Sequence, residues 1–273
     1  MTSVPGSPAE QYLDAWHRRH SDATRVFADM RDAAGRTTYE RLAALATSPQ
    51  VVLDVACGAG GLLALLQRTT ASPLILGVDL CEPELAVAAS VAPAATLLGA
   101  RAQALPLAKQ SIDVVLCHMA LMLMDAPDAV LQECRRVLRP GGTIATITNS
   151  ISVPDGVMRT VLVGLRDALR AGDPSRRPPA LGDTRAHSAP DLAALMASRF
   201  LDVTVEEFSV GQTLARDALW PFMVQSIYGL DSISDLEGIR LLAAMDLPDP
   251  VTWEVPMVQI QARAPLCLGR HSR

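Results

Sequence analysis

The sequence predicts an α/β fold in which helices cover both faces of a mostly parallel sheet. Helical stretches that end in Gly or Pro alternate with short apolar runs rich in β-branched residues, an order typical of strand–helix–strand units. The runs are continuously apolar, as expected of strands that are buried on both faces. They lie at residues 51–55, 74–78, 95–98, 114–117 and 143–148.

The segments on either side of these runs are expected to add helices and two more strands. Before the first run, the pattern from Glu10 to Ala46 is helical, with a break near Gly35. Two later stretches, 203–208 and 255–262, alternate apolar and polar side chains. This alternation indicates strands, and we expect the second to lie at the edge of the sheet. Helices are predicted at residues 158–171, 191–198 and 215–228.

Composition narrows the class of protein. Of the 273 residues, 49% are hydrophobic, so a sizeable core can be buried. A formal net charge of −5 disfavours a protein that coats nucleic acid, and the short basic cluster at 170–177 contains no aromatic residue for base stacking. The five cysteines are scattered without C-x-x-C spacing, so neither a disulfide framework nor a metal site is expected.

The sequence also bears on where the protein acts. No apolar run reaches the roughly 18–20 residues that a membrane helix needs, and residues 1–7 show no signal-peptide pattern. We therefore expect a cytoplasmic protein that acts without a membrane or nucleic-acid partner, as a monomer or homodimer.

The strongest motif is the run V-V-L-D-V-A-C-G-A-G-G at residues 51–61, where a buried strand enters a turn of small residues and a helix follows from about Gly61. Small residues let backbone N–H groups approach a ligand closely. Asp54, just before the turn, would repel a pyrophosphate but suits a cationic amino group, which points to a nucleoside that carries an amino acid. Asp54 also disfavours a nicotinamide dehydrogenase, and so does the absence of the third Gly of the dinucleotide-binding motif G-x-G-x-x-G. The alternative is an ordinary Gly-rich turn.

A second acidic residue, Asp79, ends the next predicted strand. A carboxylate at this position can accept hydrogen bonds from both ribose hydroxyls of a nucleoside. Alternatively, Asp79 caps the following helix, whose first turn holds Glu82, Pro83 and Glu84. The preceding motif favours the ribose role.

Four segments in this order and spacing resemble the class I S-adenosylmethionine (SAM)-dependent methyltransferases, in the broad group that includes the ubiquinone and menaquinone C-methyltransferases. They read L-D-V-A-C-G-A-G, V-D-L-C-E-P-E-L, A-L-P-L-A-K-Q-S-I-D-V-V and E-C-R-R-V-L-R-P-G-G. The resemblance covers roughly residues 51–148. It implies SAM as cofactor and a Rossmann-like, seven-stranded, mostly parallel sheet with an N-terminal helical lid and a helical insertion before the last strands.

The resemblance also implies which residues would bind the cofactor. Those near the methionine part of SAM would be Asp54, Ala56, Gly58 and Gly60. Asp79 would hold the ribose, Leu80 would pack on the adenine, Ala102 and Gln103 would lie at the adenine edge, and His118 would face the sulfonium.

One residue departs from the family's pattern. Where the family usually has an Asp that accepts from the adenine amino group, two residues before Gln103, this chain has Arg101. An Arg side chain only donates hydrogen bonds. Backbone groups or another side chain must then recognise the adenine.

Four residues are candidates for catalysis. His118, after the fourth strand, could act as a base, and Asn149, after the fifth, could hold a polar group of the substrate. Alternatively, His118 is only part of the wall around the cofactor, and Asn149 only caps a turn. Tyr12 and Trp16 share one helix face with His20, with His17 beside them, and could form a lid whose rings face the sulfonium. Alternatively, this face simply docks the helix.

These inferences predict a methyltransferase for a small organic acceptor, in one domain with three parts. The parts are residues 1–46, the N-terminal tail and helical lid; 47–150, the SAM-binding core; and 151–273, the acceptor-pocket helices and the closing strands. Two alternatives stay open. One is a SAM-binding enzyme that does not transfer methyl, such as a cyclase acting on SAM itself or on a bound polyene. The other is a non-catalytic SAM-binding protein.

Overall fold

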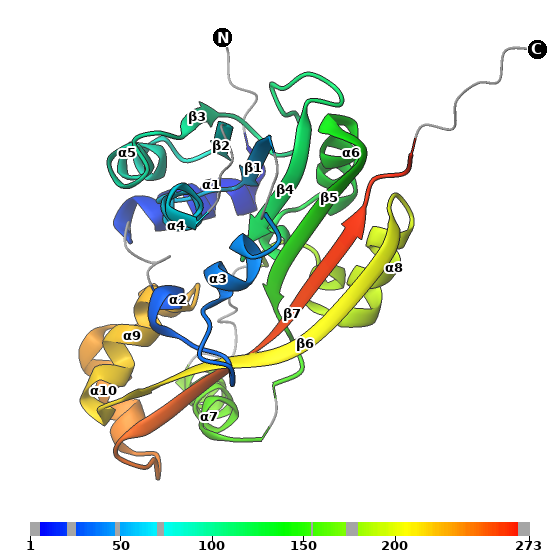
Figure 1. Ribbon diagram of the computed structural model, residues 1–273. Coiled ribbons are helices and arrows are strands. Elements are labelled where there is room, and N and C mark those ends of the chain that lie inside the picture. The colour runs from blue at the N-terminus through cyan, green and yellow to red at the C-terminus, as the bar shows by residue number, and fades with distance from the viewer. Residues whose placement is uncertain are drawn as a thin grey trace, which may run out of the picture.

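The computed structural model describes residues 6–20, 26–46, 50–69, 74–153, 155–172 and 180–266. A seven-stranded sheet runs through the molecule in the order β3-β2-β1-β4-β5-β7-β6 (Figure 1). The first five strands pair in parallel, whereas β7 is antiparallel to both β5 and β6. The strands are β1 Val51–Val55, β2 Leu74–Asp79, β3 Thr96–Gly99, β4 Ile112–His118, β5 Leu138–Asn149, β6 Leu201–Leu214 and β7 Val251–Arg263.

Helices cover both faces of this sheet, and the core therefore has two parts. Successive residues of β1 point to opposite sides, so that Val52 packs in one cluster and Leu53 in the other. Helices α3, α4, α7, α9 and α10 pack on the Val52 face, and α6 and α8 pack on the Leu53 face. The predicted fold class is confirmed. The helices are α1 Pro8–Arg19, α2 Val26–Asp29, α3 Thr38–Ala43, α4 Gly61–Thr69, α5 Glu82–Val91, α6 Pro127–Val137, α7 Val157–Gly172, α8 Ala189–Ala197, α9 Leu219–Ser226 and α10 Asp235–Ala243.

The expected edge position of the last strand is wrong. β7 lies inside the sheet between β5 and β6, and β6 forms the edge. The alternation that predicted an edge strand reports how the two faces are buried, and it carries no information about pairing along the two sides of a strand.

The N-terminal helical segment is more broken than its pattern predicted. The break near Gly35 is present, and Gly35 adopts a positive φ of 77°. The carboxylate of Asp32 accepts from the backbone N–H groups of Ala34 and Arg36 at 2.9 Å each, so it stabilises a turn that competes with helix. Thr37 then starts α3 with a capping box. Short α2 and α3 therefore stand where a longer helix was expected.

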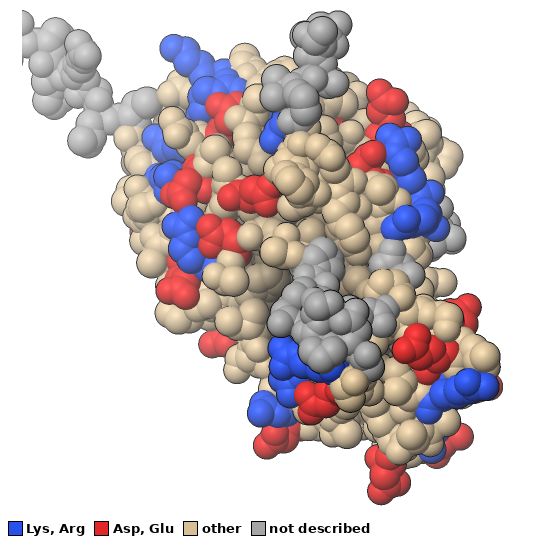
Figure 2. All heavy atoms as spheres, turned by 180° about the vertical axis from the view of Figure 1, so that it is seen from behind, with Lys and Arg blue, Asp and Glu red and all other residues tan. Residues whose placement is uncertain are grey.

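The exterior carries both signs of charge. Seen from behind, basic and acidic side chains lie intermixed over the described surface (Figure 2). Part of the basic cluster at 170–177 lies outside the described residues. Within the described ranges, no helix has the length and apolar character required to cross a membrane.

Candidate active site

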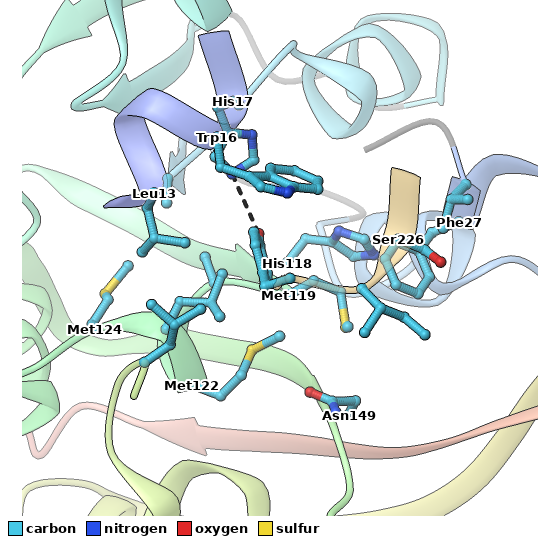
Figure 3. Close-up of a pocket in the computed structure, with 18 of the residues that line it drawn as sticks. Leu13, Trp16, His17, Phe27, His118, Met119, Met122, Met124, Asn149 and Ser226 are labelled. Carbon is cyan, nitrogen blue, oxygen red and sulfur yellow. Dashed lines mark hydrogen bonds between the residues drawn. The ribbon is translucent and has the colours of Figure 1, made fainter. Parts of the chain in front are cut away.

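One large cavity, of about 590 Å³, lies at the carboxyl ends of β1, β2, β4 and β5. Side chains from α1, α2, α7 and α9 complete its wall, so residues distant in sequence meet there. Trp16 and His17 reach into it from α1, opposite Met122 and Asn149 (Figure 3). Ligand sites of parallel α/β sheets gather at this end of the strands.

The turn after β1 forms one wall of the cavity. Ala56, Gly58 and Gly60 all have positive φ, at 58°, 49° and 82°. A Cβ on Gly60 would stand 2.9 Å from the backbone of Ala88, so this glycine allows α5 to pack closely on the turn. Ala56 and Gly58 line the cavity, whereas Gly60 does not. Gly60 therefore shapes the turn without reaching the cavity.

Asp79 joins that turn to the start of α5. Its Oδ2 accepts from the backbone N–H of Gly58 and its Oδ1 from that of Cys81, both at 2.8 Å. The carboxylate still lines the cavity. Because each carboxylate oxygen can accept more than one hydrogen bond, Asp79 can hold two hydroxyl groups of a ligand while it fixes the turn. The N-cap of α5 is Cys81, without a side-chain capping bond, so Asp79 fixes the approach to the helix and does not cap it.

Asp54 lies beneath the turn and does not line the cavity. It is only 1% exposed, and its Oδ1 has no hydrogen-bond partner within the described part of the chain. Burial, and then the negative charge of Asp79, raise the pKa of Asp54 well above its usual range. A cationic ligand group nearby would offset this cost.

Leu80, Ala102 and Gln103, which were expected beside the adenine, all line the cavity. Arg101 lies among them and donates to Oε1 of Glu10 at 2.6 Å. Glu10 also closes the capping box of α1 with Ser7. The positive charge at this edge is therefore neutralised by a carboxylate from the N-terminal helix.

His118 ends β4 and lines the cavity. Its Nε2 is hydrogen-bonded to Oγ1 of Thr38 at 2.8 Å, and its ring stacks on Tyr39 with centroids 4.1 Å apart. Burial lowers the pKa of His118 to about 3. The imidazole is therefore neutral at physiological pH and is held rigidly by α3.

The aromatic stripe of α1 is present, but its members differ in position. Trp16 is 1% exposed, stacks on His20 with centroids 4.4 Å apart and lines the cavity. Tyr12 does not line the cavity, and its hydroxyl accepts from the backbone N–H of Gly229 at 2.9 Å. Tyr12 thus fastens the helix, while Trp16 forms part of the cavity wall.

The other half of the cavity is apolar. Asn149 and His187 supply polar groups at its edge, and His187 Nδ1 is hydrogen-bonded to the backbone oxygen of Asn149 at 3.2 Å. Thioether side chains adapt to ligands of irregular shape. The apolar wall contains Phe27, Met119, Met122, Met124, Met158, Phe222 and Trp253.

Comparison with known proteins identifies the family. Residues 53–146 match the family described as a methyltransferase domain. A malonyl-[acyl-carrier protein] O-methyltransferase from Methylococcus capsulatus is 32% identical over 159 residues, which cover 54% of this chain and 58% of the relative. Residues 53–146 thus match the kind of domain that the resemblance to the class I SAM-dependent methyltransferases predicted. The chain spans less than two thirds of the length of that relative.

Solved structures of this fold cover nearly the whole chain. The [4+2]-cyclase SpnF superposes with a TM-score of 0.61 at 17% identity, over 97% of this chain and all of its own. Geranyl diphosphate C-methyltransferase from Streptomyces coelicolor superposes with a TM-score of 0.58 at 15% identity, over 96% of this chain and all of its own. At these identities the likeness shows the fold alone.

These matches confirm the resemblance found in the sequence and SAM as the cofactor that it implied. The matched segment nearly coincides with the residues that carried the resemblance. The roles of individual residues stay predictions. Of these residues, Asp54, Gly60 and Tyr12 lie outside the cavity wall, and those that line it are Trp16, Ala56, Gly58, Asp79, Leu80, Ala102, Gln103, His118 and Asn149.

No spacing or motif in the sequence groups Glu10, His17, Glu84 and Tyr228, which all line the cavity. Glu84 read as a helix-start residue and Tyr228 as the end of a helix. The usable signal was composition: the chain has only three tyrosines and five histidines, so each was worth testing as a site residue.

Proposed function

We propose that this chain binds SAM and transfers its methyl group to a small, largely apolar organic molecule. The observation that carries the proposal is a single cavity that joins two unlike halves. Carboxylates around the turn after β1 form one half, and methionine and aromatic side chains form the other. A methyl donor and its acceptor must share one such space for an in-line displacement.

The cofactor half suits a cationic nucleoside. Bound SAM supplies a methyl group activated by a sulfonium cation. Asp79, Leu80 and Gln103 all line the cavity, which supports a role for Asp79 in holding the ribose hydroxyls and for Leu80 and Gln103 in contacting the adenine. The buried Oδ1 of Asp54, which has no hydrogen-bond partner among the described residues, favours a cationic group close to the turn.

The acceptor half suits a ligand recognised by shape more than by charge. Its methionines and aromatic rings exclude water, which favours transfer to the acceptor over side reactions. Neutral His118 and Asn149 can orient a polar group of the acceptor. The names of the related proteins refer to acceptors as different as a carrier-bound malonyl group and geranyl diphosphate, so the fold leaves the acceptor open.

We also assign the lid role to residues 1–46. Three side chains of α1 reach the rest of the molecule through four contacts, Glu10–Arg101, Tyr12–Gly229, His17–Glu84 and His17–Tyr228. Closing and opening this helix would control entry to the cavity. Residues 47–150 would then bind the cofactor, and 151–273 would complete the acceptor pocket.

Product analysis tests the proposal. Purified protein is incubated with SAM, with and without a cell extract of the producing organism, and the nucleoside products are measured by mass spectrometry. S-adenosylhomocysteine that forms only with extract is the expected result, together with an extract compound heavier by one methylene. Methylthioadenosine formed without extract would make SAM itself the substrate. Loss of an extract compound with no nucleoside product would indicate a cyclase of another substrate.

A further inference from the structure

Three cavity residues from distant segments form a continuous hydrogen-bonded chain. Oε1 of Glu84, in α5, lies 3.2 Å from Nδ1 of His17, in α1. Nε2 of the same imidazole lies 3.3 Å from the hydroxyl of Tyr228, which follows α9. All three side chains line the cavity, and His17 reaches it from α1 (Figure 3).

The chemistry of the three groups fixes the direction of this chain. A carboxylate only accepts hydrogen bonds, so Nδ1 of His17 carries the proton that Glu84 accepts. Nε2 is then the accepting nitrogen, and the hydroxyl of Tyr228 donates to it. Burial, and then the charge of Glu84, raise the pKa of Tyr228, so its hydroxyl stays protonated and available as a donor.

The environment of each group suits proton transfer. Glu84 is 2% exposed, and its second oxygen has no hydrogen-bond partner among the described residues. A positive charge that develops on His17 would therefore be stabilised strongly by this carboxylate. The side chain of His17 is 19% exposed, which leaves a route for a proton to water. Tyr228 is in contact with Trp16, with ring centroids 4.5 Å apart.

We propose that Glu84, His17 and Tyr228 form a proton relay in which Tyr228 removes the proton from the methyl acceptor. This inference rests on the proposed methyltransferase function. The lone pair of the acceptor atom forms a bond to the methyl carbon, and the sulfur–methyl bond breaks with its electrons on sulfur. The acceptor's proton passes to the oxygen of Tyr228 while the phenolic proton passes to Nε2 of His17. The resulting imidazolium, paired with Glu84, later releases its proton to water.

A comparison of Tyr228 with Tyr12 separates this role from simple attachment of the lid. The hydroxyl of Tyr12 bonds to the backbone N–H of Gly229 and lies outside the cavity wall. The hydroxyl of Tyr228, one residue earlier than Gly229, bonds instead to a titratable side chain that is itself paired with a carboxylate. Only the second arrangement can move a proton.

Two Tyr→Phe variants make the matched kinetic test. Each loses one hydroxyl and keeps its ring. With SAM and the cell extract as probes, Tyr228→Phe is expected to lower kcat at least about 100-fold and to keep S-adenosylhomocysteine affinity within about three-fold. Tyr12→Phe is expected to raise the KM for SAM with a far smaller change in kcat. Glu84→Gln should also lower kcat, as Tyr228→Phe does.

Equal kcat losses in the two Tyr→Phe variants, or a loss in Tyr228→Phe explained by weaker S-adenosylhomocysteine binding, would overturn the relay. Wild-type protein that makes no S-adenosylhomocysteine overturns the proposed function itself, so the two failures are distinguishable.

A spectroscopic test needs no acceptor. Full-length protein with ¹⁵N-labelled histidine and bound S-adenosylhomocysteine should show His17 as the Nδ1–H tautomer. Tyr228→Phe should shift the Nε2 resonance and leave Nδ1 almost unchanged, whereas Glu84→Gln should mix the tautomers. An Nε2–H tautomer in the wild type would reverse the hydrogen-bond direction and exclude the relay.

Discussion

Arg101 and Glu10 form an ion pair of 2.6 Å that ties the proposed adenine edge of the cavity to the N-terminal helix. Glu10 is held at the same time by the capping box with Ser7, so its carboxylate is oriented by two contacts. The side chains are 32% and 13% exposed, which places the pair at the rim of the cavity. An Arg at this position therefore has a defined partner, and it couples the position of α1 to the cofactor half of the site.

Breaking this pair should weaken cofactor binding moderately. Arg101→Met keeps much of the side-chain length and removes the charge, so α1 should close less firmly. Because partly exposed ion pairs contribute little, we expect S-adenosylhomocysteine to bind about two- to five-fold more weakly, measured by calorimetry. Arg166→Met, which breaks the exposed pair with Asp167 on α7, is the control and should leave the affinity unchanged. Unchanged binding in Arg101→Met would show that the pair does not control closure.

Asp79→Asn should weaken cofactor binding much more. The amide keeps the shape of the side chain but cannot accept from both Gly58 and Cys81, and it removes the charge that a ribose would contact. We expect about a 10- to 100-fold loss of S-adenosylhomocysteine affinity.

Asp113→Asn is the matched control for Asp79→Asn. Asp113 also accepts from two backbone N–H groups, those of Gln50 and Val51, but at the opposite end of β1. This variant should lose stability in urea unfolding and bind S-adenosylhomocysteine normally. Similar affinity losses in both variants would show that Asp79 acts only by supporting the fold.

Asp54→Asn should stabilise the ligand-free protein. The pKa of Asp54 is raised in the folded state, so the folded state binds more protons, and stability is lost as the pH rises above the usual range of Asp. Replacing the titratable carboxyl with an amide should increase the free energy of unfolding at pH 8 by about 1–3 kcal/mol, and by less at pH 5. S-adenosylhomocysteine affinity should fall in the same variant. Lower stability at both pH values would contradict the view that the buried carboxyl of Asp54 destabilises the ligand-free protein and serves ligand binding.

Local motifs made the cofactor half of the cavity predictable from the sequence. The turn after β1 and Asp79 both lie in short strand–turn–helix segments, and their residue types are restricted by backbone conformation and close packing. The i, i+4 spacing of Trp16 and His20 likewise predicted one helix face, and their rings do stack.

Contacts between distant segments were not predictable in the same way. His17, Glu84 and Tyr228 come together only because α1 and the segment after α9 both close over the sheet. Their spacing in the sequence does not predict these contacts. For the same reason, the alternation of β7 predicted a strand but not which strands pair with it. The ion pair of Glu10 was not predictable either, because its partner Arg101 lies 91 residues further along the chain.

The buried imidazole of His118 predicts a pH dependence of stability. Its pKa falls from 6.5 to about 3 on folding, so below pH 6.5 the unfolded state binds more protons than the folded state. The contribution of His118 therefore makes the free energy of unfolding decrease as the pH falls from 6.5 towards 3, by up to about 1.4 kcal/mol per pH unit. Across pH 6–8 His118 stays neutral, and kcat should show no step from its titration.

Urea unfolding at pH 7.5 and pH 5.5 measures this contribution. The difference between the two pH values should be smaller in His118→Gln than in the wild type, since the other titrating groups are common to both proteins. Thr38→Val removes the hydroxyl bonded to Nε2 but leaves the imidazole between Tyr39 and Phe27. It should lower stability at both pH values and keep the pH dependence. If His118→Gln retains the full wild-type dependence, His118 titrates normally and can act as a base near neutral pH, which would restore it as the proton acceptor in place of Tyr228.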